Sequence, residues 1–161
     1  MKIRIYPDPV LRIVSHKADA KDKDVKGIIK KMKVVIKKEK GVGLAANQVG
    51  VTKRIILIDD FTEVIPMLNP EIIYLSSEKE VDHEGCLSFP EISVAISRHL
   101  SLKVKYEDEK GNEWVLELEG LFARAVQHEI DHLNGILLID YMTPEEKLEY
   151  NMRIAKEEAK L

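Results

Sequence analysis

Two histidines one helical turn apart offer the most informative chemistry in the chain, within His128-Glu129-Ile130-Asp131-His132. Positions i and i+4 lie on one face of a helix, so both imidazoles can reach a single cation, and Glu129 beside them can handle the protons of a water held there. Two ligands are too few for a catalytic metal centre, so another segment must supply a third. The pattern therefore predicts a metal-dependent hydrolase.

A thiolate or a carboxylate can complete this ligand set. Cys86 is the favoured candidate, because a thiolate and two imidazoles leave a fourth position open for chemistry. A helix that follows the histidines can instead donate a carboxylate, as in thermolysin-like enzymes, and offers Glu145, Glu146 and Glu149. The longer metalloprotease pattern is disfavoured, since Leu138 stands where its third histidine would be. The alternative function is thus a zinc metallopeptidase that cuts internal peptide bonds.

A glycine-containing apolar segment, Gly-Val-Gly-Leu-Ala-Ala-Asn-Gln at residues 41–48, is the third candidate for function. Its small residues let the backbone approach a ligand closely, and Gln48 offers an amide donor to a polarised oxygen. Taken alone, the segment is more typical of a turn followed by tight packing.

Hydrophobic periodicity predicts the helices that position these residues. Apolar residues at helical spacing predict one helix from Asp22 or Asp24 to Gly41, whose lysines form a solvated outer face. A second helix covers residues 121–133 and carries the two histidines. A last helix follows Thr143, which precedes a proline and stands three residues before a glutamate.

Strand patterns fill the middle of the chain. They are β-branched or alternating over residues 51–73, 93–97, 102–106 and 114–118, with a hairpin turn at 108–112. Pro66 favours an edge or bulged position. The order helix, strands, helix, helix predicts an α+β fold, and a length of 161 residues predicts a single catalytic domain over residues 1–161.

Composition narrows the classes of protein. With a single cysteine, Cys86, no intramolecular disulfide can form, which favours a reducing, cytoplasmic location. The net charge of −3 argues against a broad surface for nucleic acid or anionic membrane. No apolar run approaches the ~18 residues of a membrane span, so we expect no membrane association.

Taken together, the three segments resemble the signature motifs of the peptide deformylase family, in the family's order and approximate spacing. They are residues 41–48, Glu-Gly-Cys-Leu-Ser at 84–88 and Gln-His-Glu-Ile-Asp-His at 127–132. The resemblance extends to the segments at residues 8–11, 68–71 and 133–135, so it covers nearly the whole chain. It implies mostly antiparallel sheets packed around the central histidine helix, with an N-terminal and a C-terminal helix.

This resemblance implies a reaction and a role for each residue. The reaction is removal of the N-formyl group from the initiator methionine of new polypeptides, which releases formate. Cys86, His128 and His132 would hold one divalent metal, and Glu129 would be the general acid/base. The Gln48 side chain and the Leu87 backbone N–H would stabilise the formyl oxyanion.

The resemblance also implies the substrate contacts and partners. Gly43 and Gly85 would present backbone groups to the peptide, and the methionine pocket would be lined by Val42, Leu121 and Ala125. The family's metal is typically Fe(II), with Zn, Ni or Co as alternatives. The expected partner is an N-formyl-methionyl peptide, with transient ribosome association and no sequence-specific nucleic-acid binding. The last helix does not support electrostatic docking on RNA, since it mixes both charge signs.

Smaller expectations concern the surroundings of the site. Asp131 either orients a histidine, because metal-bound imidazoles usually donate their other N–H to an acceptor, or is a solvated residue of the helix. Arg98 can pair with a carboxylate near the site. Asn47 occupies the variable position of the first motif, where proline or threonine is common in relatives, and is expected not to alter the chemistry.

Overall fold

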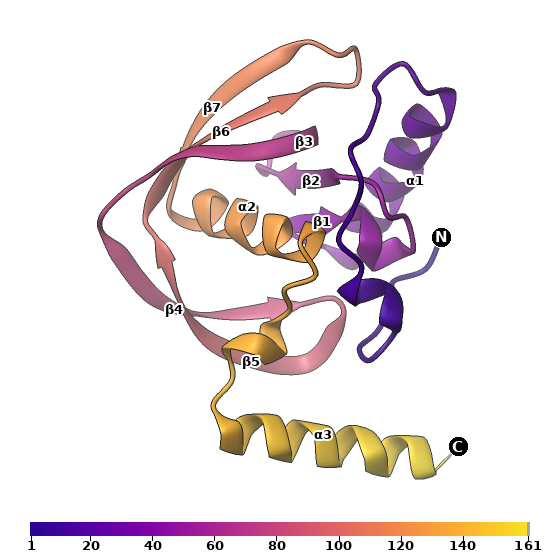
Figure 1. Ribbon diagram of the computed structural model, residues 1–161, viewed down its shortest axis with the longest axis vertical. Coiled ribbons are helices and arrows are strands. Elements are labelled where there is room, and N and C mark those ends of the chain that lie inside the picture. Colours follow the sequence, from indigo (N-terminus) through magenta and orange to yellow (C-terminus); the bar gives the residue numbers. More distant parts are fainter. Residues whose placement is uncertain (161) are drawn as a thin grey trace.

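Antiparallel strands surround a central helix in the computed structural model, which describes residues 1–160 (Figure 1). The α-helices are α1 (Lys23–Glu39), α2 (Gly120–Leu133) and α3 (Pro144–Ala159). The strands are β1 (Gly43–Ala45), β2 (Ile55–Asp59), β3 (Val64–Leu75), β4 (Lys79–Cys86), β5 (Phe89–His99), β6 (Ser101–Glu107) and β7 (Glu113–Glu119). The α+β fold with N-terminal and C-terminal helices is confirmed.

Within residues 1–160 the strands form a larger sheet in the order β1-β2-β3-β6-β7 and a separate β4-β5 hairpin. Every pairing is antiparallel. Pro66 pairs with Leu57 on β2, whereas the pairing of β3 with β6 begins at Leu68. Pro66 therefore lies where β3 has a neighbour on one side only, in agreement with its missing N–H donor.

Helix α2 lies across the inner face of the larger sheet, as its apolar spacing predicts (Figure 1). Its buried residues Ala123, Val126 and Leu133 belong to a core cluster that includes Ile56 and Met67 of the sheet. The same helix also buries His128, Glu129 and His132, which are 8%, 4% and 1% exposed. Burial of polar groups is unfavourable unless they are partnered, so this part of the helix needs specific contacts from neighbouring strands.

Helix α1 begins and ends close to the predicted residues. The Asp22 side chain accepts a hydrogen bond from the Asp24 N–H, and Lys40 ends the helix in the left-handed conformation. One face of α1 is buried against the larger sheet through Val25, Ile29, Met32, Val35 and Ile36. Its lysine-rich face remains outside the core.

Helix α3 follows the predicted capping box, in which Thr143 and Glu146 exchange side-chain-to-backbone hydrogen bonds. Its buried Tyr150 packs against Tyr6 and Phe89. Figure 1 shows α3 at one end of the molecule, beyond the β4-β5 hairpin and apart from α2. Among the helices formed by residues 1–160, none combines the length and the apolar character that a membrane crossing requires.

Candidate metal centre and its surroundings

Cys86, His128 and His132 come together where β4 meets α2. Their ligand atoms all lie within 4.8 Å of one another, and Cys86 Sγ lies 3.2 Å from His132 Nε2. The helix supplies both imidazoles from one face, and the β4-β5 hairpin brings the thiol to them. Among residues 1–160 this is the cluster of cysteine, histidine and carboxylate groups that suits a metal ion.

Glu84 holds the first histidine in position from β4. Its Oε1 is 2.9 Å from His128 Nδ1, which leaves Nε2 of that ring for the cluster. Glu84 also accepts hydrogen bonds from Arg98 of β5 and from Arg124 of α2. Burial alone would raise the pKa of Glu84, but the hydrogen bonds from His128 and Arg98 and the Arg98 charge outweigh burial and lower this pKa to about 2.

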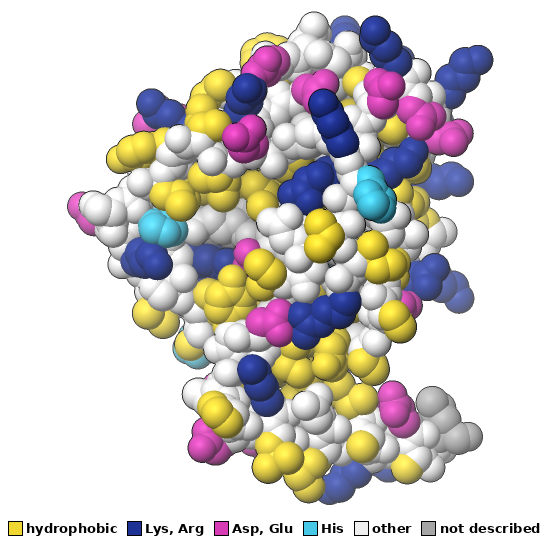
Figure 2. All heavy atoms as spheres, viewed as in Figure 1, with side chains coloured by type: hydrophobic (Ala, Val, Ile, Leu, Met, Phe, Trp, Pro, Cys, Tyr) yellow, Lys and Arg dark blue, Asp and Glu magenta, His cyan; other side chains and the backbone are white. Residues whose placement is uncertain are grey.

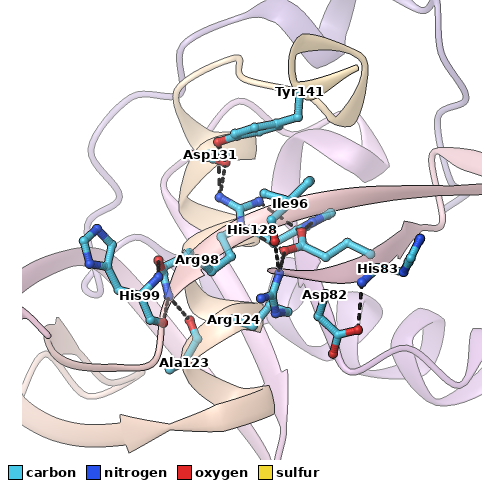
Figure 3. Close-up of polar contacts among 12 residues, drawn as sticks. Asp82, His83, Ile96, Arg98, His99, Ala123, Arg124, His128, Asp131 and Tyr141 are labelled. Atoms are coloured by element: carbon cyan, nitrogen blue, oxygen red, sulfur yellow. Dashed lines mark hydrogen bonds and ion pairs between the residues drawn. The ribbon is translucent and has the colours of Figure 1, made fainter. Parts of the chain in front are cut away.

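The ionic network continues from Arg98 to the next turn of α2. Arg98 donates to Asp131, and the Tyr141 hydroxyl also donates to that carboxylate. Figure 3 shows Arg98 extended between the His128 region and Asp131, with Tyr141 beyond it. The buried charges are thus compensated, which keeps the hairpin fixed against α2.

Glu129 is one of four buried groups in the described residues that have a side-chain atom without a hydrogen-bond partner, together with Ser15, Asn47 and His132. Its Oε1 is shielded from solvent and, within the described residues, has no hydrogen-bond partner. Burial raises the pKa of Glu129 to about 7, although the nearby His128 acts in the opposite direction. A carboxyl group with this pKa can both accept and release a proton near neutrality.

Gln48 approaches the cysteine from the segment that follows β1. Its Oε1 accepts a hydrogen bond from the Ala45 N–H, and this fixes which way the amide points. Nε2 then lies 3.4 Å from Cys86 Sγ and 3.2 Å from Ser88 Oγ. The donor end of the amide is therefore directed at the thiol and its surroundings.

A cavity of about 760 Å³ opens onto these groups. Cys86, His128, Glu129 and Gln48 line it, whereas His132 lies behind Cys86 and is almost fully buried. The residues expected to contact substrate also line the cavity: Val42, Gly43, Gly85, Leu87, Leu121 and Ala125. The structure thus brings the residues singled out from the sequence to one cavity, with His132 beneath it.

The residues fit a single divalent metal. A cysteine sulfur and two imidazole nitrogens are donors that first-row transition metals accept, and the close approach of all three suits one shared ion. Nδ1 of His128 is already engaged by Glu84, as is typical of an imidazole whose other nitrogen binds a metal.

A comparison with protein families decides the classification, because the model described as "Polypeptide deformylase" matches residues 1–148. The chain belongs to this family. Two relatives named peptide deformylase support the assignment. The one from Thermotoga maritima is 44% identical over 147 residues, covering 91% of this chain and 90% of the relative. The one from Rhizobium meliloti is 40% identical, covering 94% and 88%.

Solved deformylase structures have the same architecture. The crystal structure of the Thermotoga maritima peptide deformylase has a TM-score of 0.84 at 45% identity, covering 89% of this chain and 97% of that one. The Ehrlichia chaffeensis enzyme in complex with actinonin has a TM-score of 0.91 at 33% identity, covering 98% and 97%. The sheets, the central helix and the terminal helices of this deformylase are therefore those of the family.

The alternative third ligands of the metallopeptidase hypothesis do not reach the site of this deformylase. Glu145, Glu146 and Glu149 are exposed on α3 and are absent from the metal-type cluster of the described residues. The expectation that Asp131 orients a histidine is wrong, because its partners are Arg98 and Tyr141.

Two contributors to the deformylase site were missed from the sequence. Glu84, rather than Asp131, accepts the hydrogen bond from a histidine. The signal available in the sequence was its place two residues before Cys86. Asn47 donates from its side chain to the His132 carbonyl at 2.6 Å and so ties the first motif to α2. Its polarity at a buried position was the signal, since a buried amide requires partners.

We expect Glu84→Gln to weaken both the fold and metal binding. An amide cannot neutralise the buried guanidinium of Arg98 or the partly buried one of Arg124, so the free energy of unfolding should fall by about 3 kcal/mol. Metal affinity should fall by about 10–100-fold because His128 loses its orienting acceptor. Denaturant titration and a metal-chelator competition measure the two effects.

The matched control is Asp131→Asn, which removes the other carboxylate from Arg98 but leaves Glu84 on His128. This variant should lose stability and retain metal affinity. Equal losses of metal affinity in the two variants would contradict the orienting role of Glu84.

We expect Gly43→Ala to inactivate the deformylase without unfolding it. An added Cβ would lie 2.5 Å from Glu129 Oε2 and 2.9 Å from its Cγ, so the carboxylate would have to move. A displacement of about 1 Å at a reacting group can lower the rate by about 100-fold. Steady-state kinetics checks this, with Gly27→Ala as control, because no atom lies within 4 Å of the Cβ added there. Activity of Gly43→Ala equal to that of Gly27→Ala would contradict the prediction.

Proposed function

We propose that this deformylase hydrolyses the N-formyl group from the terminal formyl-methionine of newly made polypeptides, and that residues 1–161 act as one catalytic domain in the cytoplasm. The observation that carries the proposal is the unpartnered, buried Glu129 carboxylate at a cavity that also contains Cys86 and His128. A proton acceptor next to a metal-type ligand cluster is the arrangement that hydrolysis of an unreactive amide requires.

Cys86, His128 and His132 would hold one divalent metal. When bound, such an ion supplies Lewis acidity, which polarises a carbonyl oxygen and lowers the pKa of water. Glu84 keeps His128 turned toward the cluster through the hydrogen bond to Nδ1.

Glu129 moves the proton in this proposal. It accepts a proton from the attacking water and gives it to the amine that leaves when the formyl C–N bond breaks, so that formate and a free amino terminus are produced. Its raised pKa suits both halves of this task. Gln48 Nε2 and the Leu87 N–H donate hydrogen bonds to the formyl oxygen as negative charge develops there.

The cavity accounts for the proposed substrate. Val42, Leu121 and Ala125 line it with apolar surface for the methionine side chain. Gly43 and Gly85 lie at the cavity without side chains, so their backbone groups are accessible to an extended peptide.

The test is formate release from a short formyl-methionyl peptide by anaerobically purified protein, with bound metal quantified in the same sample. We expect one metal per chain and stoichiometric formate. A fully occupied site that releases no formate would overturn the proposal. Cleavage of internal bonds in unformylated peptides would instead favour the zinc metallopeptidase.

We propose Fe(II) as the native metal, with Zn, Ni or Co able to occupy the same site, since Cys and His donors suit several first-row ions. Half-exposed Cys86 and a ferrous ion would both be open to oxidation, so activity should decay faster in air than under nitrogen. Equal half-lives would argue against iron.

We also propose a transient association with the ribosome, because the substrate is a polypeptide that has just been made there. Co-sedimentation with ribosomes at physiological salt tests this association.

A further inference from the structure

The outward face of α1 has an unusual charge distribution for a protein whose net charge is −3. Between Lys23 and Lys40 the chain has eight lysines against Asp24 and Glu39. At 100° per residue, the lysines at 23, 26, 30, 31, 33, 37 and 38 share one side of the helix, and all of them are exposed except the half-buried Lys33. Asp24 and Glu39 are also exposed, but Asp24 lies at the edge of this lysine arc and Glu39 lies outside it.

This pattern is unfavourable for the helix itself. Like charges four residues apart, as at Lys26 and Lys30 or Lys33 and Lys37, destabilise a helix by a few tenths of a kcal/mol per pair. A helix surface that serves only solubility or heat resistance mixes Glu with Lys, so that opposite charges on neighbouring turns of the helix attract each other. The ion pairs of Lys33 with Glu109 and Lys37 with Asp59 are made with other segments, at the flanks.

The lysines are available to a partner. Lys26, Lys30 and Lys31 are exposed and make no salt bridge among residues 1–160. In Figure 2, Lys and Arg side chains project along the right-hand edge, the side on which Figure 1 draws α1, with Asp and Glu side chains among them near the top. The face is roughly 20 Å long, which is enough to follow several phosphates of a nucleic-acid strand.

Two other kinds of partner fit this face poorly. A helix that binds a membrane surface inserts its apolar face, but in α1 that face is buried in the core through Val25, Ile29, Met32 and Ile36. Protein interfaces are enriched in aromatic residues and Arg and depleted in Lys, whereas the α1 face offers lysines and the exposed Val34. A phosphate backbone needs only dense positive charge.

We propose that the lysine face of α1 docks this deformylase on the phosphate backbone of ribosomal RNA. RNA is selected because the proposed substrate is made on the ribosome, so this inference rests on the proposed function. The position of the helix supports it: Glu39 at its end and Gly41 just beyond line the catalytic cavity. A docked α1 therefore places the cavity next to the RNA surface. Helix α3 offers no comparable face, because it has five Glu against Lys147, Arg153 and Lys156.

The test compares two triple variants with the same change in net charge. One is Lys26→Gln, Lys30→Gln and Lys31→Gln on α1, and the control is Lys147→Gln and Lys156→Gln on α3 with Lys160→Gln at its C-terminal cap. Binding to ribosomes and to protein-free ribosomal RNA is measured between about 50 and 200 mM salt, where phosphate contacts weaken steeply.

We expect the α1 variant to lose at least about tenfold in affinity for both probes, and the slope of log K against log salt to fall by about 0.7–0.9 for each phosphate contact removed. The α3 variant should bind within about threefold of the unmodified chain. Equal losses in the two variants, or no loss in either, would overturn the proposal.

Three further outcomes would also overturn it. One is failure of the unmodified chain to bind ribosomes or ribosomal RNA. Another is equal binding to vesicles of phosphatidylglycerol, which would make the face a membrane site. The third is dimerisation in sedimentation velocity that disappears in the α1 variant, which would make a second copy the partner.

Formate release from a free peptide separates this inference from the proposed function. The α1 variant should keep the kcat/KM of the unmodified chain. If the unmodified chain binds ribosomes but releases no formate, the proposed function fails and the docking surface stands; the reverse result removes only the docking surface.

Discussion

Cys86→Ala is expected to remove the metal and the activity together. The thiol is one of three donor groups in the cluster, and the two imidazoles that remain are too few for a stable catalytic site. Mutation of a residue that only orients a metal ligand lowers metal affinity or activity by about 10–100-fold, so loss of a ligand itself should lower them by more than that. Metal analysis of the purified variant and steady-state formate release measure the two losses.

The control for Cys86→Ala must show that the fold survives. Cys86 is half-exposed at the end of β4, and its replacement removes one sulfur atom from the cavity wall, so the circular dichroism spectrum should be unchanged. Ser88→Ala is the matched variant, because it removes a neighbouring polar atom that Gln48 contacts but is not a proposed ligand. A Cys86→Ala protein with a full equivalent of metal and normal formate release would contradict the thiol ligand and show that another donor completes the ligand set.

Glu129→Gln is expected to keep the metal and lose the reaction. The amide has nearly the same shape but cannot accept a proton from water, and general acid/base catalysis typically contributes about 10²–10⁴-fold to the rate. The loss should appear in kcat, with little change in KM, because Glu129 acts in the transition state rather than in binding of the peptide.

The comparison that isolates this effect is Glu145→Gln, the same chemical change on the exposed first turn of α3. That variant should match the unmodified chain in kcat, metal content and melting temperature. If Glu129→Gln retained its kcat within about threefold, another group would have to carry the proton, and the proposed role of the carboxylate would be wrong.

Local features of the sequence were sufficient to predict the helices and the metal-binding chemistry. Capping by Asp22 and Thr143 and the apolar spacing of residues 121–133 act within one or two helical turns, so the sequence alone predicts where these helices begin. The two histidines of α2 share a face for the same reason, since helical geometry places positions i and i+4 together.

Partners in the ionic network depended on the tertiary structure. Asp131 lies between the two histidines in the sequence, and Glu84 lies two residues before Cys86. Only the packing of the β4-β5 hairpin against α2 shows that Glu84 reaches His128 while Asp131 binds Arg98. Buried charges pair with whichever opposite charge the fold brings within reach, and no local pattern encodes that distance.

The amino-acid sequence by itself determined the helices, the strand-rich middle of the chain and the donor types of the metal centre, because periodicity, capping and ligand chemistry are properties of neighbouring residues. Tertiary structure alone decided that Cys86, rather than a glutamate of α3, lies beside His128 and His132. It also decided that the lysine face of α1, which the sequence predicts, ends at the cavity. Both outcomes follow from how sheets and helices pack, which brings together residues that are far apart along the chain.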